Sequence, residues 1–159
     1  MSGWEHFDHS EDETMTRQEK KALIERLHDI WSTGDTRSIN EVYAESFIAH
    51  MPKGWGRAPS RDGRDGVRGA IERLRVGFPD WGEHIDDVVI DEDRVAVRYH
   101  STGTHLGTFA GMPASGRRIE VDELSIFRIK DGRVVEQWCL NYDLAFGKQI
   151  RGEPLSLES

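Results

Sequence analysis

Side chains that can transfer protons gather near the C-terminus, in the stretch DGRVVEQWCLNYDLAFGKQI at residues 131–150. Glu136, Asn141 and Asp143 stand there among apolar residues whose alternation predicts a half-buried strand. A carboxylate held in a pocket can take a proton from carbon and return it to oxygen, which is general acid–base catalysis. Either these polar groups face water, or the strand forms one wall of a cavity in which they act.

Alternation along this strand determines which side chains share a face. If Trp138 faces the cavity, Leu140 and Tyr142 face it as well, and a β-bulge after Trp138 is needed to turn Asp143 inward. In that arrangement Asp143 can move a proton within the cavity, and the Tyr142 hydroxyl can donate a hydrogen bond to a bound oxygen. The alternative leaves Asp143 in solvent at the end of the strand.

The preceding strand supplies three more candidates for the pocket wall. Asp122, Leu124 and Arg128 share one face by alternation, and we expect this face to line the pocket. An arginine inside the pocket would lower the pKa of a neighbouring carboxyl or stabilise an enolate. An outward Arg128 paired with surface acids is the alternative.

Two histidines and two aromatic residues complete the predicted site. His50, in the segment FIAHMP, is expected on a short strand, where an imidazole can orient a carbonyl or carry a proton near neutral pH. A partly buried histidine bonded to the backbone is the alternative for His50. Gly103, two residues before His105, suggests a bend that leaves the direction of His105 open. Trp31 and Tyr99 are expected to point into the pocket, from a helix and a strand respectively.

The periods of the apolar residues predict the elements that position these side chains. TRQE at residues 16–19 is a capping box that opens a helix, and apolar residues at helical spacing mark another helix over residues 67–78. A short helix over residues 38–44 and a short strand over residues 47–52 lie between them. The period then changes to two, which predicts strands at residues 84–90, 95–105 and 118–129 and from residue 133 onward. This order predicts an α+β domain over residues 15–152, with a flexible acidic tail at 1–14 and a short tail at 153–159.

Composition restricts the classes of partner. The chain has 159 residues, a formal net charge of −8 and a pI of about 5.4, so it lacks the basic surface that nucleic acids and anionic membranes require. No apolar run reaches the roughly 20 residues of a membrane-spanning helix, and the acidic N-terminal segment does not have the pattern of a signal peptide. We expect a cytoplasmic protein, because a chain with one cysteine forms no internal disulfide and a reducing compartment is then the default. The chain has a single cysteine, Cys139, so we expect no internal disulfide. No two histidines have the spacing of metal ligands on a helix, so we expect no metal site.

Three motifs carry a resemblance to a known family. Residues 103–109 read GTHLGTF, residues 111–117 read GMPASGR, and residues 126–138 read IFRIKDGRVVEQW. In this order they resemble the SnoaL-like polyketide cyclases, also called ester cyclases, and the resemblance extends over roughly residues 18–152. It implies the nuclear transport factor 2-like fold, an α+β cone in which N-terminal helices pack on a strongly curved, mostly antiparallel sheet.

The resemblance also implies a reaction. Members of the family close a ring by an intramolecular aldol-type reaction on a polyketide ester, with an aspartate of the last strand as acid and base and with no cofactor. Carried onto this chain, the aspartate is Asp143, and the family's histidine partner falls near Arg128, where this chain has arginine. Because of that difference, two further interpretations stay open. One is a non-catalytic module that binds a small molecule, and the other is an isomerase, dehydratase or hydrolase of the same superfamily.

We also expect a homodimer, because this fold often associates through the convex side of its sheet. Alternation places Arg98, His100, Phe127 and Cys139 on that side. Phe127 and Cys139 are apolar for a surface in contact with water, which favours their burial against a second copy of the chain.

Overall fold

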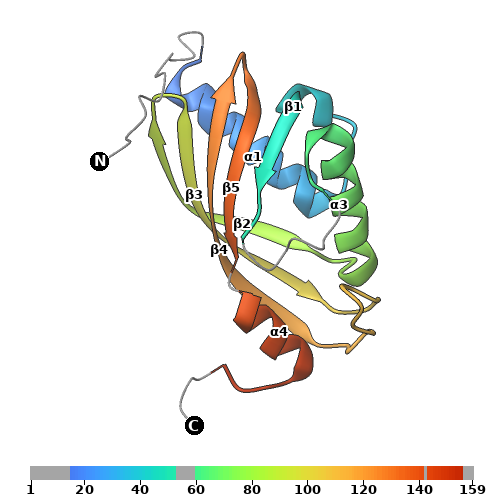
Figure 1. Ribbon diagram of the computed structural model, residues 1–159. Coiled ribbons are helices and arrows are strands. Elements are labelled where there is room, and N and C mark those ends of the chain that lie inside the picture. The colour runs from blue at the N-terminus through green and yellow to red at the C-terminus, as the bar shows by residue number, and fades with distance from the viewer. Residues whose placement is uncertain (1–14, 53–59, 142, 156–159) are drawn as a thin grey trace, which may run out of the picture.

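The computed structural model describes residues 15–52, 60–141 and 143–155, so the expected N-terminal tail at residues 1–14 lies outside the described residues. Helices dominate its first half and long strands its second half (Figure 1). The elements are α1 (Arg17–Thr33), α2 (Ile39–Val42), β1 (Tyr43–His50), α3 (Gly63–Gly77), β2 (Gly82–Asp91), β3 (Arg94–Thr104), β4 (Arg118–Lys130), β5 (Arg133–Asn141) and α4 (Asp143–Arg151).

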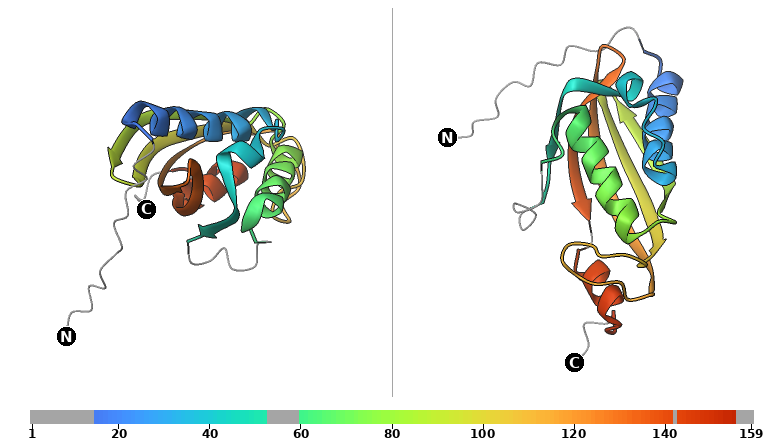
Figure 2. Two further views of the ribbon diagram at one scale, coloured as in Figure 1. Left: turned by 90° about the horizontal axis from the view of Figure 1, so that it is seen from above. Right: turned by 90° about the vertical axis from the view of Figure 1, so that its right-hand side faces the viewer.

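The five strands form one mixed sheet in the order β1-β5-β4-β3-β2. Strand β1 pairs in parallel with β5, and the other neighbours pair antiparallel through hairpins. At the β4–β5 turn, Asp131 and Gly132 both have positive φ, at 51° and 73°, which matches the twist of the strands that they join. The sheet curves around α1 and α3 (Figure 2), and this arrangement confirms the predicted α+β fold.

Helix α1 shows how local sequence signals set the scaffold. The predicted capping box is present: the Glu19 backbone N–H donates to Thr16 Oγ1 at 3.1 Å, and the Thr16 N–H donates to Glu19 Oε2 at 2.7 Å. Gly34, with φ of 72°, ends the helix in the left-handed conformation that glycine adopts without strain. The apolar face of α1 packs on β2 and β3 and buries residues such as Ile24 and Leu27.

Two elements differ from the expectation. The short helix covers only Ile39–Val42, and the chain is already extended at Tyr43. The chain beyond Asn141 turns into helix α4 (Asp143–Arg151), which the strand-like alternation did not predict. An acid in the first turn and the bases Lys148 and Arg151 in the last turn complement the helix dipole.

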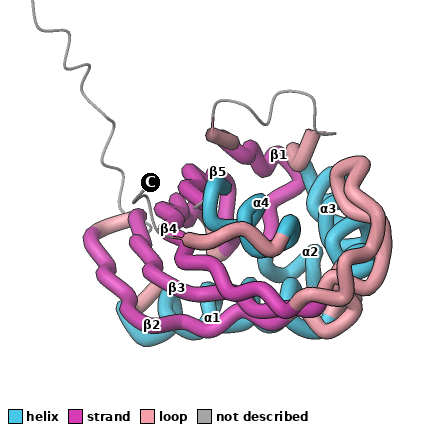
Figure 3. Tube along the Cα trace, turned by 90° about the horizontal axis from the view of Figure 1, so that it is seen from below, coloured by secondary structure: helices cyan, strands magenta, loops and turns pink. Residues whose placement is uncertain are grey.

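Helix α4 lies at one end of the sheet, between β5 and α3 when the molecule is seen from below (Figure 3). Its Phe146 ring lies 5.6 Å from the Phe78 ring and 5.7 Å from that of Phe109, in the loop between β3 and β4. The loop and the helix therefore hold one another through edge-on aromatic contacts.

A β-bulge in β5 decides which way the last strand faces. Arg128 pairs with Glu136 and Ile129 pairs with Val134, so Val135 is an extra residue on β5. The bulge shifts the alternation by one residue. Val134 faces the core, and from Gln137 onward the odd-numbered residues face the concave side.

Candidate active site

A pocket of about 660 Å³, including space open to solvent, lies between the concave face of the sheet and the helices. One part of its wall is aromatic and another is polar, which is typical of sites that hold a flat ligand and orient it. The lining residues are Leu27, His28, Trp31, Arg61, Leu74, Trp81, Glu83, Tyr99, Phe109, Val121, Glu123, Phe127, Gln137, Cys139, Asn141, Asp143 and Phe146.

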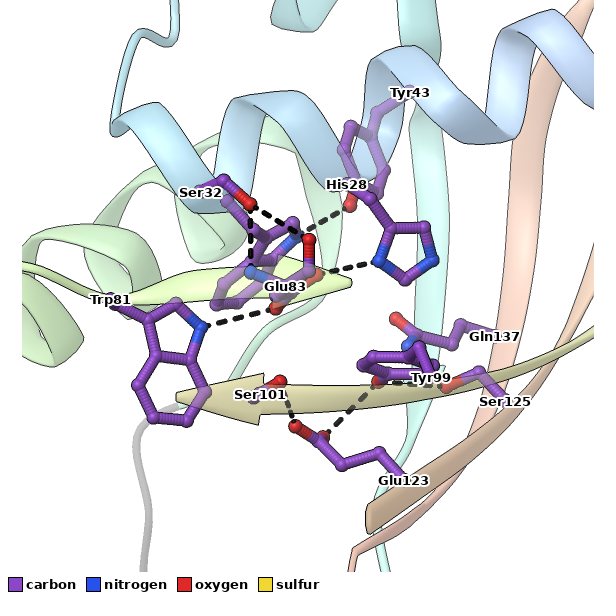
Figure 4. Close-up of polar contacts among 11 residues, drawn as sticks. His28, Ser32, Tyr43, Trp81, Glu83, Tyr99, Ser101, Glu123, Ser125 and Gln137 are labelled. Atoms are coloured by element: carbon purple, nitrogen blue, oxygen red, sulfur yellow. Dashed lines mark hydrogen bonds and ion pairs between the residues drawn. The ribbon is translucent and has the colours of Figure 1, made fainter. Parts of the chain in front are cut away.

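Glu123 of β4 is the most deeply held carboxyl group of this wall, with 8% of its surface exposed. The Ser101 hydroxyl donates to Glu123 Oε1 at 2.5 Å, and the Tyr99 hydroxyl donates to Glu123 Oε2 at 3.1 Å. Both donors come from β3, the neighbouring strand (Figure 4). Each carboxyl oxygen therefore has a fixed partner, which orients the group within the pocket.

A chain of hydrogen bonds sets the direction in which Tyr99 donates. The Gln137 amide Nε2 donates to Ser125 Oγ at 3.0 Å, and Ser125 Oγ lies 3.3 Å from the Tyr99 hydroxyl oxygen. Because an amide N–H only donates, Ser125 accepts from Gln137 and directs its own hydrogen to Tyr99. Tyr99 is then left to donate to Glu123, so the chain ends on that carboxyl group.

A second carboxyl group with little exposure, that of Glu83 on β2, lines the same pocket (Figure 4), and 8% of its side chain is exposed. His28 Nδ1 and Glu83 Oε2 are 2.6 Å apart, and the Trp81 indole N–H donates to Glu83 Oε1 at 3.3 Å. A carboxylate only accepts, so Nδ1 of His28 carries the hydrogen of this bond. His28 Nε2 is buried without a hydrogen-bond partner among the described residues.

The environment raises the pKa values of three groups on the pocket wall. Burial, reinforced by the negative charge of Glu83, raises the pKa of Glu123 to about 7. Burial and then the Glu123 charge raise the pKa of the Tyr99 phenol well above its ordinary value, so Tyr99 remains a donor. The same two causes raise the pKa of the Cys139 thiol to about 11.

Asn141 and Asp143 stand at the junction of β5 and α4 and line the same pocket. The Cys139 thiol donates to Asn141 Oδ1 at 2.6 Å, which fixes the amide at the end of the strand. Asp143 is the first residue of α4 and is exposed. The pocket thus has a solvated carboxyl group at the α4 junction and buried carboxyl groups on β2 and β4.

Three of the residues that the sequence predicted for the site, namely Trp31, Tyr99 and Asp143, line this pocket. Trp31 donates its indole N–H to the Tyr43 hydroxyl at 2.9 Å, so its ring is held in place. Tyr142 lies outside the described residues. Asp143 shares the concave side with Cys139 and Asn141 without a bulge after Trp138, because the bulge occurs earlier, at Val135.

The prediction that five residues line the pocket is wrong, because they lie on the other face of the sheet. These residues are Asp122, Leu124, Arg128, Trp138 and Leu140. On β4 the buried positions are the odd-numbered ones, so Glu123 and Phe127 point inward instead. On β5 the bulge at Val135 turns Trp138 outward. The same correction applies to Phe127 and Cys139, which were expected on the convex side and are buried on the concave side.

The two predicted histidines lie apart from the pocket. His50 ends β1 on the outer face, where its Nε2 is 2.8 Å from Glu136 Oε2 and its ring stacks on Trp138 at 4.9 Å. Arg128 also donates to Glu136, at 2.6 Å, so these three residues form a surface network. His105 is fully buried behind the pocket wall, stacked on Phe78 at 5.1 Å.

The alternation along the sequence held signals for the polar residues that were missed. On the inward face of β4, Glu123 and Ser125 lie between Val121 and Phe127. A buried acid between buried apolar residues indicates a functional site rather than a solvent-exposed surface. His28 directly follows Leu27 on the apolar face of α1. Glu83 had no such signal, because β2 carries acids along both of its faces.

Within residues 15–52, 60–141 and 143–155, no three His, Cys, Asp or Glu side chains are placed to hold a metal ion together. None of the helices in these ranges is long and apolar enough to span a membrane.

Comparison with known proteins identifies the family. A family model described as SnoaL-like polyketide cyclase matches residues 21–150. The aklanonic acid methyl ester cyclases DauD of Streptomyces sp. (strain C5) and DnrD of Streptomyces peucetius are each 26% identical over 114 residues. The match covers 70% of this chain in both cases, and 69% of DauD and 77% of DnrD.

Solved structures agree with the family model. TsrD from Streptomyces laurentii is 28% identical with a TM-score of 0.75, and the match covers 86% of this chain and 97% of TsrD. IdmH from Streptomyces antibioticus is 30% identical with a TM-score of 0.72, and the match covers 82% of this chain and 97% of IdmH. The expected nuclear transport factor 2-like fold is thereby confirmed.

Proposed function

Because this chain belongs to the SnoaL-like polyketide cyclase family, we propose that it closes a ring in a polyketide-like ester by an intramolecular aldol-type reaction. The observation that supports this most is the pocket itself, which combines aromatic walls with carboxyl groups at separate positions. Aromatic side chains such as Trp31 and Trp81 give a flat conjugated chain a surface to lie on. The proposed chemistry uses no metal or organic cofactor.

Asp143 is the proposed base of the reaction. A carbon between two carbonyls is a strong enough acid for a carboxylate to deprotonate it when the two are held in contact. Asp143 lines the pocket where β5 passes into α4, beside the amide of Asn141. Once the enolate forms, a pocket that holds the chain bent brings its carbon against the receiving carbonyl, and this positioning supplies much of the rate.

The names of the two curated relatives suggest the first compound to test, aklanonic acid methyl ester. We expect the purified protein to convert it to a ring-closed product of the same mass, which separates from the ester by chromatography and differs in absorbance. The matched control is the heat-unfolded protein. A pocket that binds the ester, as shown by quenching of tryptophan fluorescence, without forming product would contradict the proposal and favour the binding module.

We also propose a homodimer formed by the outer face of the sheet. Phe127 and Cys139, the apolar residues that first suggested it, are buried, but other apolar residues are exposed there: Leu124 at 44%, Ile126 at 40% and Leu140 at 63%. They border a hollow that includes His50 and Trp138. A contiguous apolar patch of this kind favours cover by another protein surface.

Light scattering after gel filtration tests the dimer. Wild-type protein is expected to have twice the chain mass at micromolar concentration. The double variant Leu124→Glu/Leu140→Glu places charges in the patch and is expected to be monomeric with an unchanged circular dichroism spectrum. A wild-type monomer would contradict the dimer and leave the proposed reaction unaffected.

A further inference from the structure

The buried carboxyl group of Glu123 has no task in a reaction in which Asp143 alone moves protons. We propose that Glu123 is the general acid of the ring closure, which gives its proton to the carbonyl oxygen that becomes a hydroxyl group. This inference rests on the proposed function and deepens it, because it assigns the two halves of the proton transfer to two different carboxyl groups.

The hydrogen bonds of Glu123 leave room for a proton. Ser101 donates to Oε1 and Tyr99 donates to Oε2, so each oxygen uses one of its acceptor positions. A carboxyl group offers about four such positions, so a proton can occupy another one on either oxygen. Glu123 lines the pocket, and a protonated Glu123 can therefore donate to a bound carbonyl while both partners hold it in place.

Charged and titratable groups around the pocket determine whether Glu123 keeps a proton. Glu83, from β2, disfavours a second negative charge, whereas Arg61 favours one. The phenol of Tyr99 and the thiol of Cys139 both stay neutral at pH 7, since their own pKa values are raised. His28 is bonded to Glu83 and not to Glu123. Burial dominates and places the pKa of Glu123 at about 7, so the protonated form is well populated at neutral pH.

Asp143 occupies a different place in the pocket from Glu123. It is an exposed residue at the start of helix α4. Two carboxyl groups in one pocket with such different environments have separate roles, the solvated one as base and the buried one as acid. The structure places the base where β5 meets α4 and the acid on β4.

The reaction balances with these two groups. The Asp143 carboxylate takes the proton from the carbon between two carbonyls, and the electron pair of that C–H bond forms the enolate. The enolate carbon attacks a carbonyl carbon of the same molecule, the π pair moves to oxygen, and this oxygen takes the proton of Glu123. In the substrate, one C–H bond and one C=O π bond break while one C–C bond and one O–H bond form, so the mass is unchanged. Water then returns the proton from Asp143 to Glu123.

The protonation of Glu123 can be measured without any substrate. In protein labelled with ¹³C at glutamate carboxyl carbons, the Glu123 signal is identified by its loss in Glu123→Gln. We expect this signal to titrate near pH 7. A titration in the ordinary glutamate range would overturn the inference, whether or not the protein is an enzyme.

Turnover of aklanonic acid methyl ester tests the role of that proton. Glutamine keeps the shape of the side chain but cannot give up a proton to the alkoxide, so Glu123→Gln is expected to lower kcat roughly 100- to 10,000-fold. The matched control is Glu120→Gln, on the same strand but with an exposed side chain outside the pocket, which should keep kcat within about twofold. Circular dichroism and thermal melting show whether both variants fold.

The dependence of kcat on pH shows whether Tyr99 positions and tunes Glu123 or only supports the structure. Tyr99→Phe removes a hydrogen bond that lowers the pKa of Glu123. The kcat of a reaction that needs a protonated acid falls as the pH rises through that pKa, so this fall should move to higher pH in Tyr99→Phe. A fall at an unchanged pH would show that Tyr99 does not act through Glu123.

The outcomes distinguish the inference from the function on which it rests. Wild-type protein that leaves the ester unchanged contradicts the proposed function, while the carboxyl titration still decides the state of Glu123. Wild-type protein that closes the ring, with an equally active Glu123→Gln variant, overturns the inference alone and leaves Asp143 as the single acid and base.

Discussion

On the concave face of the β4–β5 hairpin, Glu123, Ser125 and Gln137 belong to one hydrogen-bonded network, whereas on the convex face Leu124 and Leu140 are exposed to solvent. The requirements of folding alone favour the opposite arrangement, with apolar side chains inside and polar ones outside. A buried polar group destabilises the protein unless it is hydrogen-bonded. The polar groups inside are bonded, so the sheet tolerates them. The difference between the faces supports the two proposals, a ligand site on the inner face and a partner surface on the outer face.

The largest expected difference between the faces concerns turnover of the ester. Asp143→Asn keeps the shape of the pocket but removes the proposed base, so kcat should fall roughly 100- to 10,000-fold. Glu136→Gln makes the same chemical change on the outer face, where Glu136 binds Arg128 and His50, and should change kcat less than about twofold. Steady-state kinetics on both variants measures the contrast. Equal effects of the two substitutions would remove the functional distinction between the faces.

The reactivity of Cys139 tests how well the inner face excludes water. Because its thiol has a pKa of about 11, only a small fraction is thiolate at pH 7.5, and the thiolate is the reactive form. Labelling with iodoacetamide should be roughly 100-fold slower than that of an unfolded control, since two pKa units reduce the thiolate about 100-fold. Mass spectrometry over time measures both rates. Labelling as fast as in the unfolded chain would mean that this wall of the pocket is open.

The dependence of stability on pH should reveal the buried carboxyl group. The pKa of Glu123 is about 7 in the folded protein, against an ordinary value of 4.5. Between these two values the folded state holds a proton that the unfolded state has lost. The free energy of unfolding therefore falls as the pH rises, by up to about 1.4 kcal/mol per pH unit.

Glu123→Gln isolates this contribution, because glutamine is neutral at every pH. Its free energy of unfolding, from urea titrations at several pH values, should lack the loss that wild type shows between pH 4.5 and 7. Glu120→Gln, which changes an exposed acid on the same strand, should retain the wild-type slope. Parallel curves for wild type and Glu123→Gln would mean that Glu123 is ionised in the folded protein throughout this range.

Sequence reasoning recovered the fold well because its signals are local. The capping box at Thr16, the period of α1 and α3 and the Asp131–Gly132 turn each act within a few residues. Which side chains of β5 point to the concave side is not determined by such local signals. It depends on a bulge at Val135, where no glycine or proline marks the extra residue and only the pairing with β4 reveals it.

The site was recovered in part, for a related physical reason. Asp143 was assigned to the pocket from its distance along the chain to Trp138, and it does line the pocket, although it begins a helix that was not predicted. Glu83 and His28 come from β2 and α1, and their 2.6 Å contact depends on how α1 packs on the sheet. Such a pair is set by tertiary packing and leaves no spacing pattern in the sequence.

The most direct test of the functional inner face is a crystal structure of the Asp143→Asn variant with aklanonic acid methyl ester, which this variant is expected to bind without converting it. The ester is expected between Trp31 and Trp81, with one carbonyl oxygen within hydrogen-bond distance of Glu123 and the carbon between two carbonyls beside residue 143. An ester bound in the outer hollow beside Trp138, or an inner pocket that stays free of it at saturating concentration, would contradict a functional site on the inner face.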